Sequence, residues 1–155
     1  MRRLLCVIVL AAVMAGCADS APQTEAPVEA TLTTQQLMAH VLEPAADRIW
    51  DSAGFIMTEA GEESLAPTTE EGWLDVQHGA AVVTESGNLL MVAGRSEGRE
   101  EWIAISRGLI DVGQQAMAAA EAQDADALFE AGSALYGVCL ACHQVYWADG
   151  GRFTD

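Results

Sequence analysis

Apolar residues recur every three to four positions along four stretches of the chain, at about residues 33–53, 69–91, 97–122 and 124–147. This spacing places apolar side chains on one face of an α-helix and polar side chains on the other. We find no convincing strand pattern, so the sequence predicts helices only. The predicted apolar faces consist of Met38, Val41, Leu42, Ala45 and Ile49 in the first stretch, Trp73, Val76, Ala80, Val83, Gly87, Leu90 and Met91 in the second, Trp102, Ile105, Leu109, Val112 and Ala116 in the third, and Leu128, Gly132, Leu135, Tyr136, Cys139, His143 and Tyr146 in the fourth. The polar face of the first stretch consists of Gln36, His40, Glu43, Asp47 and Asp51.

A few residues mark where these helices begin or break. Thr68 and Glu71, three positions apart, predict a capping box at the start of the second helix. Asp124 or Asp126 is a suitable N-cap for the fourth helix. Pro44 lies inside the first stretch and lacks the backbone N–H that a helix interior needs, so we expect a kink or a break just before it.

Four amphipathic helices in succession predict an all-α fold, an antiparallel four-helix bundle within residues 32–155. The longest connection, residues 54–67, joins the first two helices. A three-helix domain with a loosely attached first helix is the main alternative.

The N-terminus has the layout of a secretory signal peptide, which we assign to residues 1–16. Two arginines precede an apolar run, residues 4–14, and two small residues follow it. The run is shorter than the roughly 20 apolar residues that a membrane-spanning helix needs. Residues 17–31 contain two prolines and no apolar period, which is typical of a flexible tether.

The segment Met14-Ala15-Gly16-Cys17 resembles a bacterial lipoprotein signal, with Met14 where leucine is usual. In that family the cysteine is acylated and becomes the N-terminus of the mature protein. The resemblance implies lipidation of Cys17. Because Ala18 rather than aspartate follows, it also implies anchoring in the outer membrane, through an acyl chain that does not span it. Plain signal cleavage without lipidation is the alternative.

The chain is strongly acidic, with a formal net charge of −16 and no lysine. Two of the seven basic residues lie in the signal peptide while all 23 acidic residues follow it, so the mature chain has a charge near −18. Such a surface argues against binding to nucleic acid and to anionic lipid headgroups. The preferred explanation of the acidic surface is solubility, and the second explanation is a docking partner with a basic surface.

The fourth helical stretch contains Cys139-Leu140-Ala141-Cys142-His143, the Cys-x-x-Cys-His attachment motif for haem c. Two thiols at this spacing add to the two vinyl groups of one haem, and the following histidine then lies beneath the iron as its proximal axial ligand. Cys139 and His143 are one helical turn apart and share the inner face. The alternatives are a redox-active disulfide, which usually begins a helix beside a strand, and a zinc site, which needs a further ligand.

The position of this motif near the C-terminus of a predicted four-helix bundle resembles the class II cytochromes c, the cytochrome c′ group. The resemblance covers about residues 32–147, and Tyr146, three residues after the motif, suits it as well. It implies one covalently bound haem c within the bundle. Class II members often carry a basic residue one turn before the distal haem residue, whereas this chain has Thr34 there. Arg95 or Arg99 is the candidate to replace that cation beside the haem propionates.

The second axial position of the iron decides between functions. Antiparallel topology places the start of the first helix and the end of the second at the same end as His143, so Met38 and Met91 can both lie near it. By the resemblance, Met38 holds the distal position, either as an iron ligand or as a cover over an open site. His40 and His78 are predicted to face outwards. A methionine on an apolar stripe is also an ordinary packing residue.

A methionine-ligated haem would make the protein a periplasmic electron carrier that serves redox partner proteins in the cell envelope. A five-coordinate haem would instead bind NO or CO, as a scavenger or sensor. We do not expect an enzyme, because no acid–base group is predicted near the iron. Class II cytochromes are often homodimers through their first two helices, which the carboxylates of Glu43, Asp47 and Asp51 would disfavour here. Trp102, Tyr136 and Trp147 are candidate aromatic neighbours of the haem, although packing in the core explains them equally well.

Overall fold

The computed structural model describes residues 28–96 and 98–147. Most of these residues are helical, as the sequence predicts. The predicted signal peptide, the lipidation site Cys17 and most of the predicted tether lie outside the described residues.

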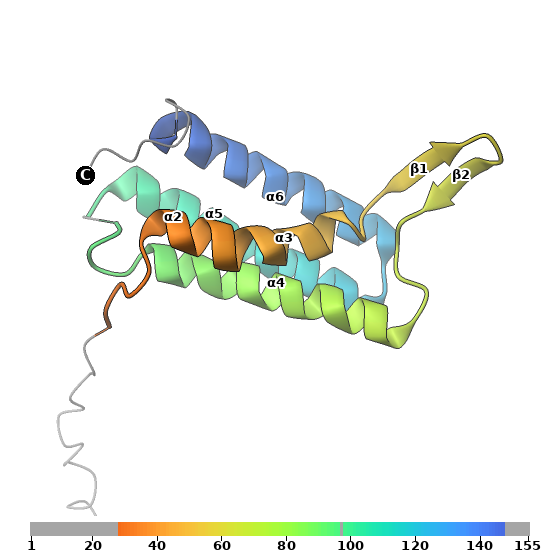
Figure 1. Cartoon of the computed structure of the whole chain (residues 1–155), viewed down its shortest axis with the longest axis horizontal. Helices are drawn as coiled ribbons and strands as arrows, with labels where there is room; N and C mark the ends of the chain where they lie inside the picture. Colours follow the sequence, from red (N-terminus) through yellow and green to blue (C-terminus); the bar gives the residue numbers. More distant parts are fainter. Residues whose placement is uncertain (1–27, 97, 148–155) are drawn as a thin grey trace, which may run out of the picture.

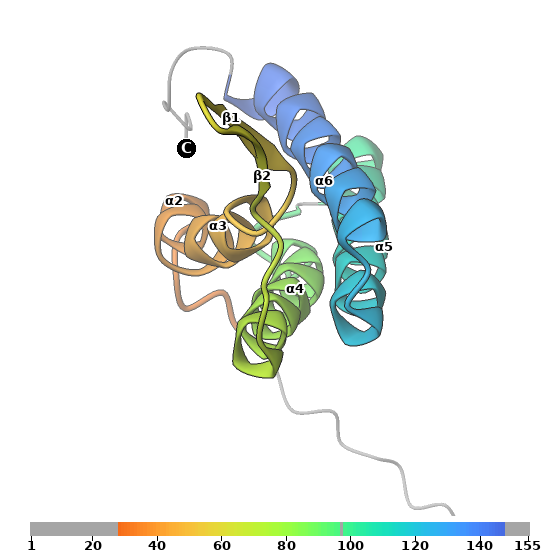
Figure 2. The same cartoon turned by 90° about the vertical axis from the view of Figure 1, so that its right-hand side faces the viewer.

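Four long helical segments run up, down, up and down (Figure 1). The first helix spans Thr34–Trp50, and it is followed by α4 (Glu70–Leu90), α5 (Glu100–Ala122) and α6 (Ala125–Tyr146). Viewed along the bundle, the first helix lies beside α4, α4 beside α5, and α5 beside α6 (Figure 2). The predicted antiparallel arrangement is therefore confirmed, and the first helix packs on the other three rather than standing apart.

The first helix is built from three elements: α2 (Thr34–Leu37), the π-helix η1 (Met38–Leu42) and α3 (Glu43–Trp50). It begins with a capping box that the sequence analysis did not single out. The Thr33 hydroxyl accepts a hydrogen bond from the Gln36 N–H at 3.1 Å, and the Gln36 side-chain oxygen accepts one from the Thr33 N–H at 3.0 Å. This reciprocal pair satisfies two backbone donors at the helix start.

Pro44 accounts for the wide π turn that precedes it. In a regular α-helix its ring would collide with the carbonyl oxygen four residues earlier, and its nitrogen has no hydrogen to donate. The N–H of Glu43 reaches instead to the oxygen of Met38, five residues back. Leu37 and Leu42, also five positions apart, are consequently both buried. The disturbance expected at Pro44 is thus present, as a π turn within a continuous helix.

The N-caps of α4 and α6 come from side chains just before each helix. The predicted capping box of Thr68 and Glu71 is wrong, because Thr69 is the N-cap and its hydroxyl accepts from the Gly72 N–H at 3.1 Å. Two adjacent threonines offer the same hydroxyl, so the sequence pattern does not distinguish them. Asp124 caps α6, accepting from the N–H of residue 127 at 3.0 Å, which confirms one of the two predicted candidates.

A β-hairpin interrupts the connection between the first helix and α4, which the sequence did not predict. Strand β1 (Phe55–Thr58) pairs antiparallel with β2 (Gly61–Ser64). The Thr58 hydroxyl donates to the Gly61 carbonyl at 2.8 Å, and Gly61 has a φ of +123°, which favours glycine. All eight strand residues are exposed. Neither strand therefore shows the alternation of apolar and polar residues that burial of one face imposes.

The core lies between the helices, and α4 and α5 share the most extensive contact. Glycine permits part of this contact, since a Cβ added to Gly113 would lie 2.5 Å from the Thr84 Oγ1 and 2.8 Å from its backbone nitrogen. The buried apolar residues are Leu37, Leu42, Ala45, Ala46, Ile49, Trp73, Val76, Ala80, Val83, Leu90, Trp102, Leu109, Val112, Ala116, Ala119, Ala120, Leu128, Ala131 and Leu135. Most of the predicted apolar faces therefore form the core, as expected.

The first helix and α6 are held together near one end. There the indole N–H of Trp50, the last residue of α3, donates to the carbonyl oxygen of Gly132 at 3.0 Å. From this point the two helices diverge toward the end of the bundle where α2 begins and α6 ends (Figure 1).

Candidate functional site

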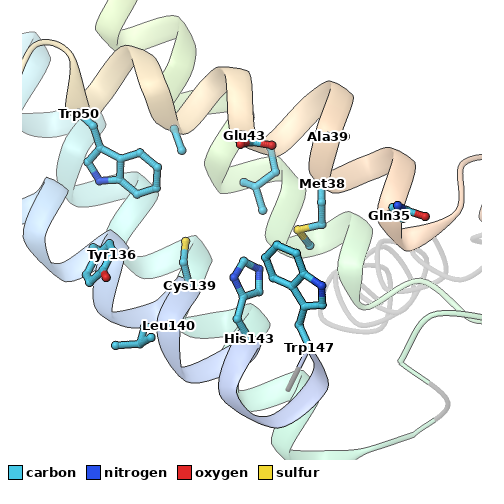
Figure 3. Close-up of a pocket in the computed structure, with 12 residues that line it drawn as sticks. Gln35, Met38, Ala39, Glu43, Trp50, Tyr136, Cys139, Leu140, His143 and Trp147 are labelled. Carbon is cyan, nitrogen blue, oxygen red and sulfur yellow. The ribbon is translucent and has the colours of Figure 1, made fainter. Parts of the chain in front are cut away.

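A groove lies between the first helix and α6, and we call it the α6 groove. Its volume is about 550 Å³, which falls within the range of about 300–1,000 Å³ typical of small-molecule and cofactor sites. Side chains of the first helix form one wall, and side chains of α6 form the other (Figure 3). The lining residues are Gln35, Met38, Ala39, Leu42, Glu43, Ala46, Trp50, Tyr136, Cys139, Leu140, His143 and Trp147.

The Cys-x-x-Cys-His motif lies on the α6 wall. Cys139 and His143, one helical turn apart, both line the groove. Cys142 instead lines a small adjoining cavity of about 30 Å³, to which Cys139 and His143 also contribute. Both cysteines are free thiols. The three predicted haem-binding residues are thus brought together at one edge of the groove, with Cys142 on its inner side.

Burial holds both thiols in the neutral form. It raises the pKa of Cys139 to about 11, with a smaller contribution from the neighbouring Cys142. Burial also raises the pKa of Cys142, and the Arg99 guanidinium opposes that shift. Redox-active Cys-x-x-Cys pairs show a lowered thiol pKa, because their chemistry needs a thiolate near neutral pH. The surroundings of this pair therefore argue against the redox-disulfide alternative.

His143 is partly buried at the end of the groove nearest the C-terminus of α6. Its ring meets the Trp147 indole edge to face, with 4.6 Å between ring centroids and 81° between planes. Burial lowers the pKa of His143, and the Glu43 carboxylate on the first helix opposes this shift. The imidazole is consequently neutral near pH 7, the form in which a ring nitrogen can ligate a metal.

Met38 is the methionine that the structure brings to this histidine. It lines both the groove and the small cavity, as His143 does, and it extends from the first helix toward the α6 wall (Figure 3). Met91 follows the last residue of α4 and lines neither space. His40 and His78 are exposed, which confirms the prediction that they face outwards. The fold therefore favours Met38 over the other predicted distal candidates.

Two of the three predicted aromatic neighbours line the groove. Tyr136 and Trp147 do so, and they remain 61% and 44% exposed because the groove is open. Trp102 lines neither space, and of its two predicted roles the structure bears out packing in the core. Its ring is buried in the core, donates its N–H to the Leu90 carbonyl at 2.7 Å and packs on Tyr146 at 4.9 Å between centroids.

Neither arginine that was expected to compensate for Thr34 lines the groove. Arg95 is buried, and its guanidinium donates to the carbonyl oxygens of Leu89 at 2.7 Å and Leu32 at 2.8 Å, so it joins the end of α4 to the entry of the first helix. Arg99 donates to the Arg95 carbonyl at 2.7 Å and lies over the ring of Trp102, 4.7 Å from its centroid. Both side chains therefore serve the packing at this end of the bundle.

Several lining residues were not found by sequence reasoning. Gln35, Ala39, Ala46 and Trp50 were not singled out, and Glu43 was placed on the polar face opposite the core. Glu43 is indeed exposed, but it also lines the groove. The signal that could have revealed it is Pro44, because a π turn adds one residue to a helical turn and so shifts the phase of every position that follows.

Within the described part of the chain, no group of three or more histidine, cysteine, aspartate or glutamate side chains converges to hold a metal ion.

By length and composition alone, α6 is long and apolar enough to cross a membrane. In the bundle, 22% of its most apolar 18-residue segment is buried. The fold and site together define a helical bundle with a cofactor-sized groove along its last helix. No protein-family model matches the chain, and no curated protein or solved structure matches it either.

Proposed function

We propose that this protein is a c-type cytochrome of the class II kind, an electron carrier with one haem c in the α6 groove. Cys139 and Cys142 would hold the haem through thioether bonds, and His143 would be the proximal iron ligand. One observation carries the proposal: a thiol and a neutral imidazole from a Cys-x-x-Cys-His motif line an apolar groove of cofactor size.

The groove residues fit a flat, apolar prosthetic group. Tyr136, Leu140 and Trp147 expose 61%, 43% and 44% of their surface beside the two motif residues of the groove wall. Large apolar side chains that gather around a concave site usually mark a ligand or a partner surface. A planar ring held between α6 and the first helix would cover them and gain the free energy of their burial.

Haem, when bound, supplies an iron that accepts and releases one electron at a time. His143 would orient and hold that iron through one ring nitrogen, and the adjoining Trp147 ring restricts how the imidazole can turn. Met38 lines the facing wall and would supply a thioether sulfur as a further iron ligand, which supports the electron-carrier proposal.

A five-coordinate haem that binds NO or CO is the second candidate. The openness of the groove favours it, since the side chains at its mouth are accessible to solvent and small molecules could enter. The two candidates differ in one measurement. A reduced spectrum that CO leaves unchanged supports the electron carrier, whereas a high-spin spectrum that shifts on adding CO supports the gas-binding protein.

We propose a location in the bacterial envelope, with the mature chain anchored to the outer membrane by lipid on Cys17. The lipoprotein-like signal supports this, and cytochrome c maturation outside the cytoplasm agrees with it. The acidic surface supports a redox partner with a basic docking face. Labelling with radioactive palmitate, in the parent and in Cys17→Ser, would test the anchor separately from the haem.

The haem itself is tested by expressing the full chain with functional cytochrome maturation machinery. We expect a denatured protein that remains coloured and whose mass exceeds that of the processed polypeptide by one haem. Cys139→Ser combined with Cys142→Ser should abolish the covalent attachment, while Gln144→Ala, an exposed position on the same helix that does not line the groove, should preserve it. A colourless parent protein of unmodified mass would refute the proposal.

A further inference from the structure

The π turn places one carboxylate on the wall of the α6 groove. Glu43 is the first residue of α3 and directly follows η1, and its backbone N–H donates to the Met38 oxygen. Its side chain lines the groove together with Met38 and Ala39 of the same helix (Figure 3). Pro44 imposes the π turn, so the local sequence itself directs this carboxylate to the groove.

Among the described residues, Glu43 is the only carboxylate that lines the groove, and no arginine of that part of the chain lines it. Arg48, one turn further along α3, pairs with Asp75 of α4 at 3.5 Å. In the described part of the chain, no ion pair or side-chain hydrogen bond neutralises Glu43. The two nearby carboxylates, Asp47 of the same helix and Asp51 at its C-cap, are exposed and line neither cavity.

Glu43 and the proposed iron ligand lie on facing walls of the same groove. Glu43 belongs to the first helix and His143 to α6, and both side chains line the groove (Figure 3). A negative charge on the wall of this groove favours the more positive state of a metal ion held there. The influence of Glu43 on this position is therefore electrostatic and does not require contact with the iron.

We propose that Glu43 is a positioning residue that sets the reduction potential of the haem iron by stabilising its ferric state. The inference rests on the proposed function, because it requires a haem in the groove. Uptake of one electron turns ferric iron into ferrous iron and lowers the charge of the site by one unit. A nearby carboxylate therefore stabilises the oxidised form more than the reduced form, and the midpoint potential is lower than it would be without the charge.

Redox titration of the haem-loaded protein at neutral pH and low ionic strength tests the inference. Glu43→Gln removes the charge and keeps the shape, so at a fixed solution potential the ratio of ferrous to ferric protein should rise roughly fivefold, which is about 1 kcal/mol. Glu43→Asp keeps the charge and should restore most of the parent value. Asp47→Asn removes an exposed charge from the same helix and should change the ratio much less.

The salt dependence provides a second readout, because the effect of an exposed charge is screened by ions. The difference between parent and Glu43→Gln should shrink as ionic strength rises. Equal shifts for Glu43→Gln and Asp47→Asn, or an unchanged potential in Glu43→Gln, would overturn the role of Glu43. Absence of covalent haem in the parent protein would overturn the proposed function instead, so the two failures are distinguishable.

Discussion

The substitution Gly113→Ala tests how closely α5 packs on α4. A Cβ added at this position would lie 2.5 Å from the Thr84 Oγ1, 2.8 Å from its backbone nitrogen and 3.0 Å from its Cα. Two of these atoms belong to the backbone, so in Gly113→Ala one helix must move away from the other. We expect the overpacking to cost about 3 kcal/mol. The higher helix propensity of alanine returns about 1 kcal/mol, which leaves a net loss of about 2 kcal/mol.

The same substitution at Gly137 on α6 is the matched control. A Cβ added there meets no other atom within 4 Å, so Gly137→Ala should stabilise the protein by about 0.5–1 kcal/mol through helix propensity alone. Urea unfolding of the mature chain, followed by circular dichroism, should therefore move the midpoint down for Gly113→Ala and up for Gly137→Ala. A Gly113→Ala variant as stable as the parent would refute the close contact of α4 with α5.

Two further predictions concern the groove. Trp50→Phe removes the hydrogen bond to Gly132 and should cost about 0.5–1.5 kcal/mol in urea unfolding, while Trp147→Phe, at an exposed position, should cost less. In the haem-free mature chain, burial raises the pKa of Cys139 to about 11, compared with 9.0 for an unperturbed thiol. The rate at which iodoacetamide alkylates Cys139, measured by peptide mass, should therefore keep rising above pH 9. Because the unfolded chain releases this proton first, the folded state should also lose stability as pH rises from 9 to 11. An alkylation rate that levels off near pH 9 would contradict both statements.

The raised thiol pKa values also bear on which chemistry the motif performs. A Cys-x-x-Cys pair in sequence is compatible with a disulfide, a metal site or a haem attachment site. The burial of Cys139 beside a groove and of Cys142 in the adjoining cavity raises both thiol pKa values, whereas a reactive dithiol has a lowered one. This environment depends on α5 and the first helix as well as on α6, and it is therefore a property of the packed bundle.

The amino-acid sequence by itself determined the local features of this protein. The four helices, the N-cap at Asp124, the outward positions of His40 and His78, and the place of the Cys-x-x-Cys-His motif were all predictable. Each depends on the periodicity of apolar residues or on side chains within a turn of one another, and such short-range preferences act before any helix meets another.

Only the tertiary structure decided what surrounds the motif. The groove lies between α6 and the first helix, whose Trp50 donates a hydrogen bond to the carbonyl oxygen of Gly132, 82 positions further along the chain. The packing of Trp102 in the core keeps its ring out of the groove. The local phase shift at Glu43 can be traced to Pro44, but periodicity says nothing about the angle between helices, so their splay is not encoded in any single stretch of sequence.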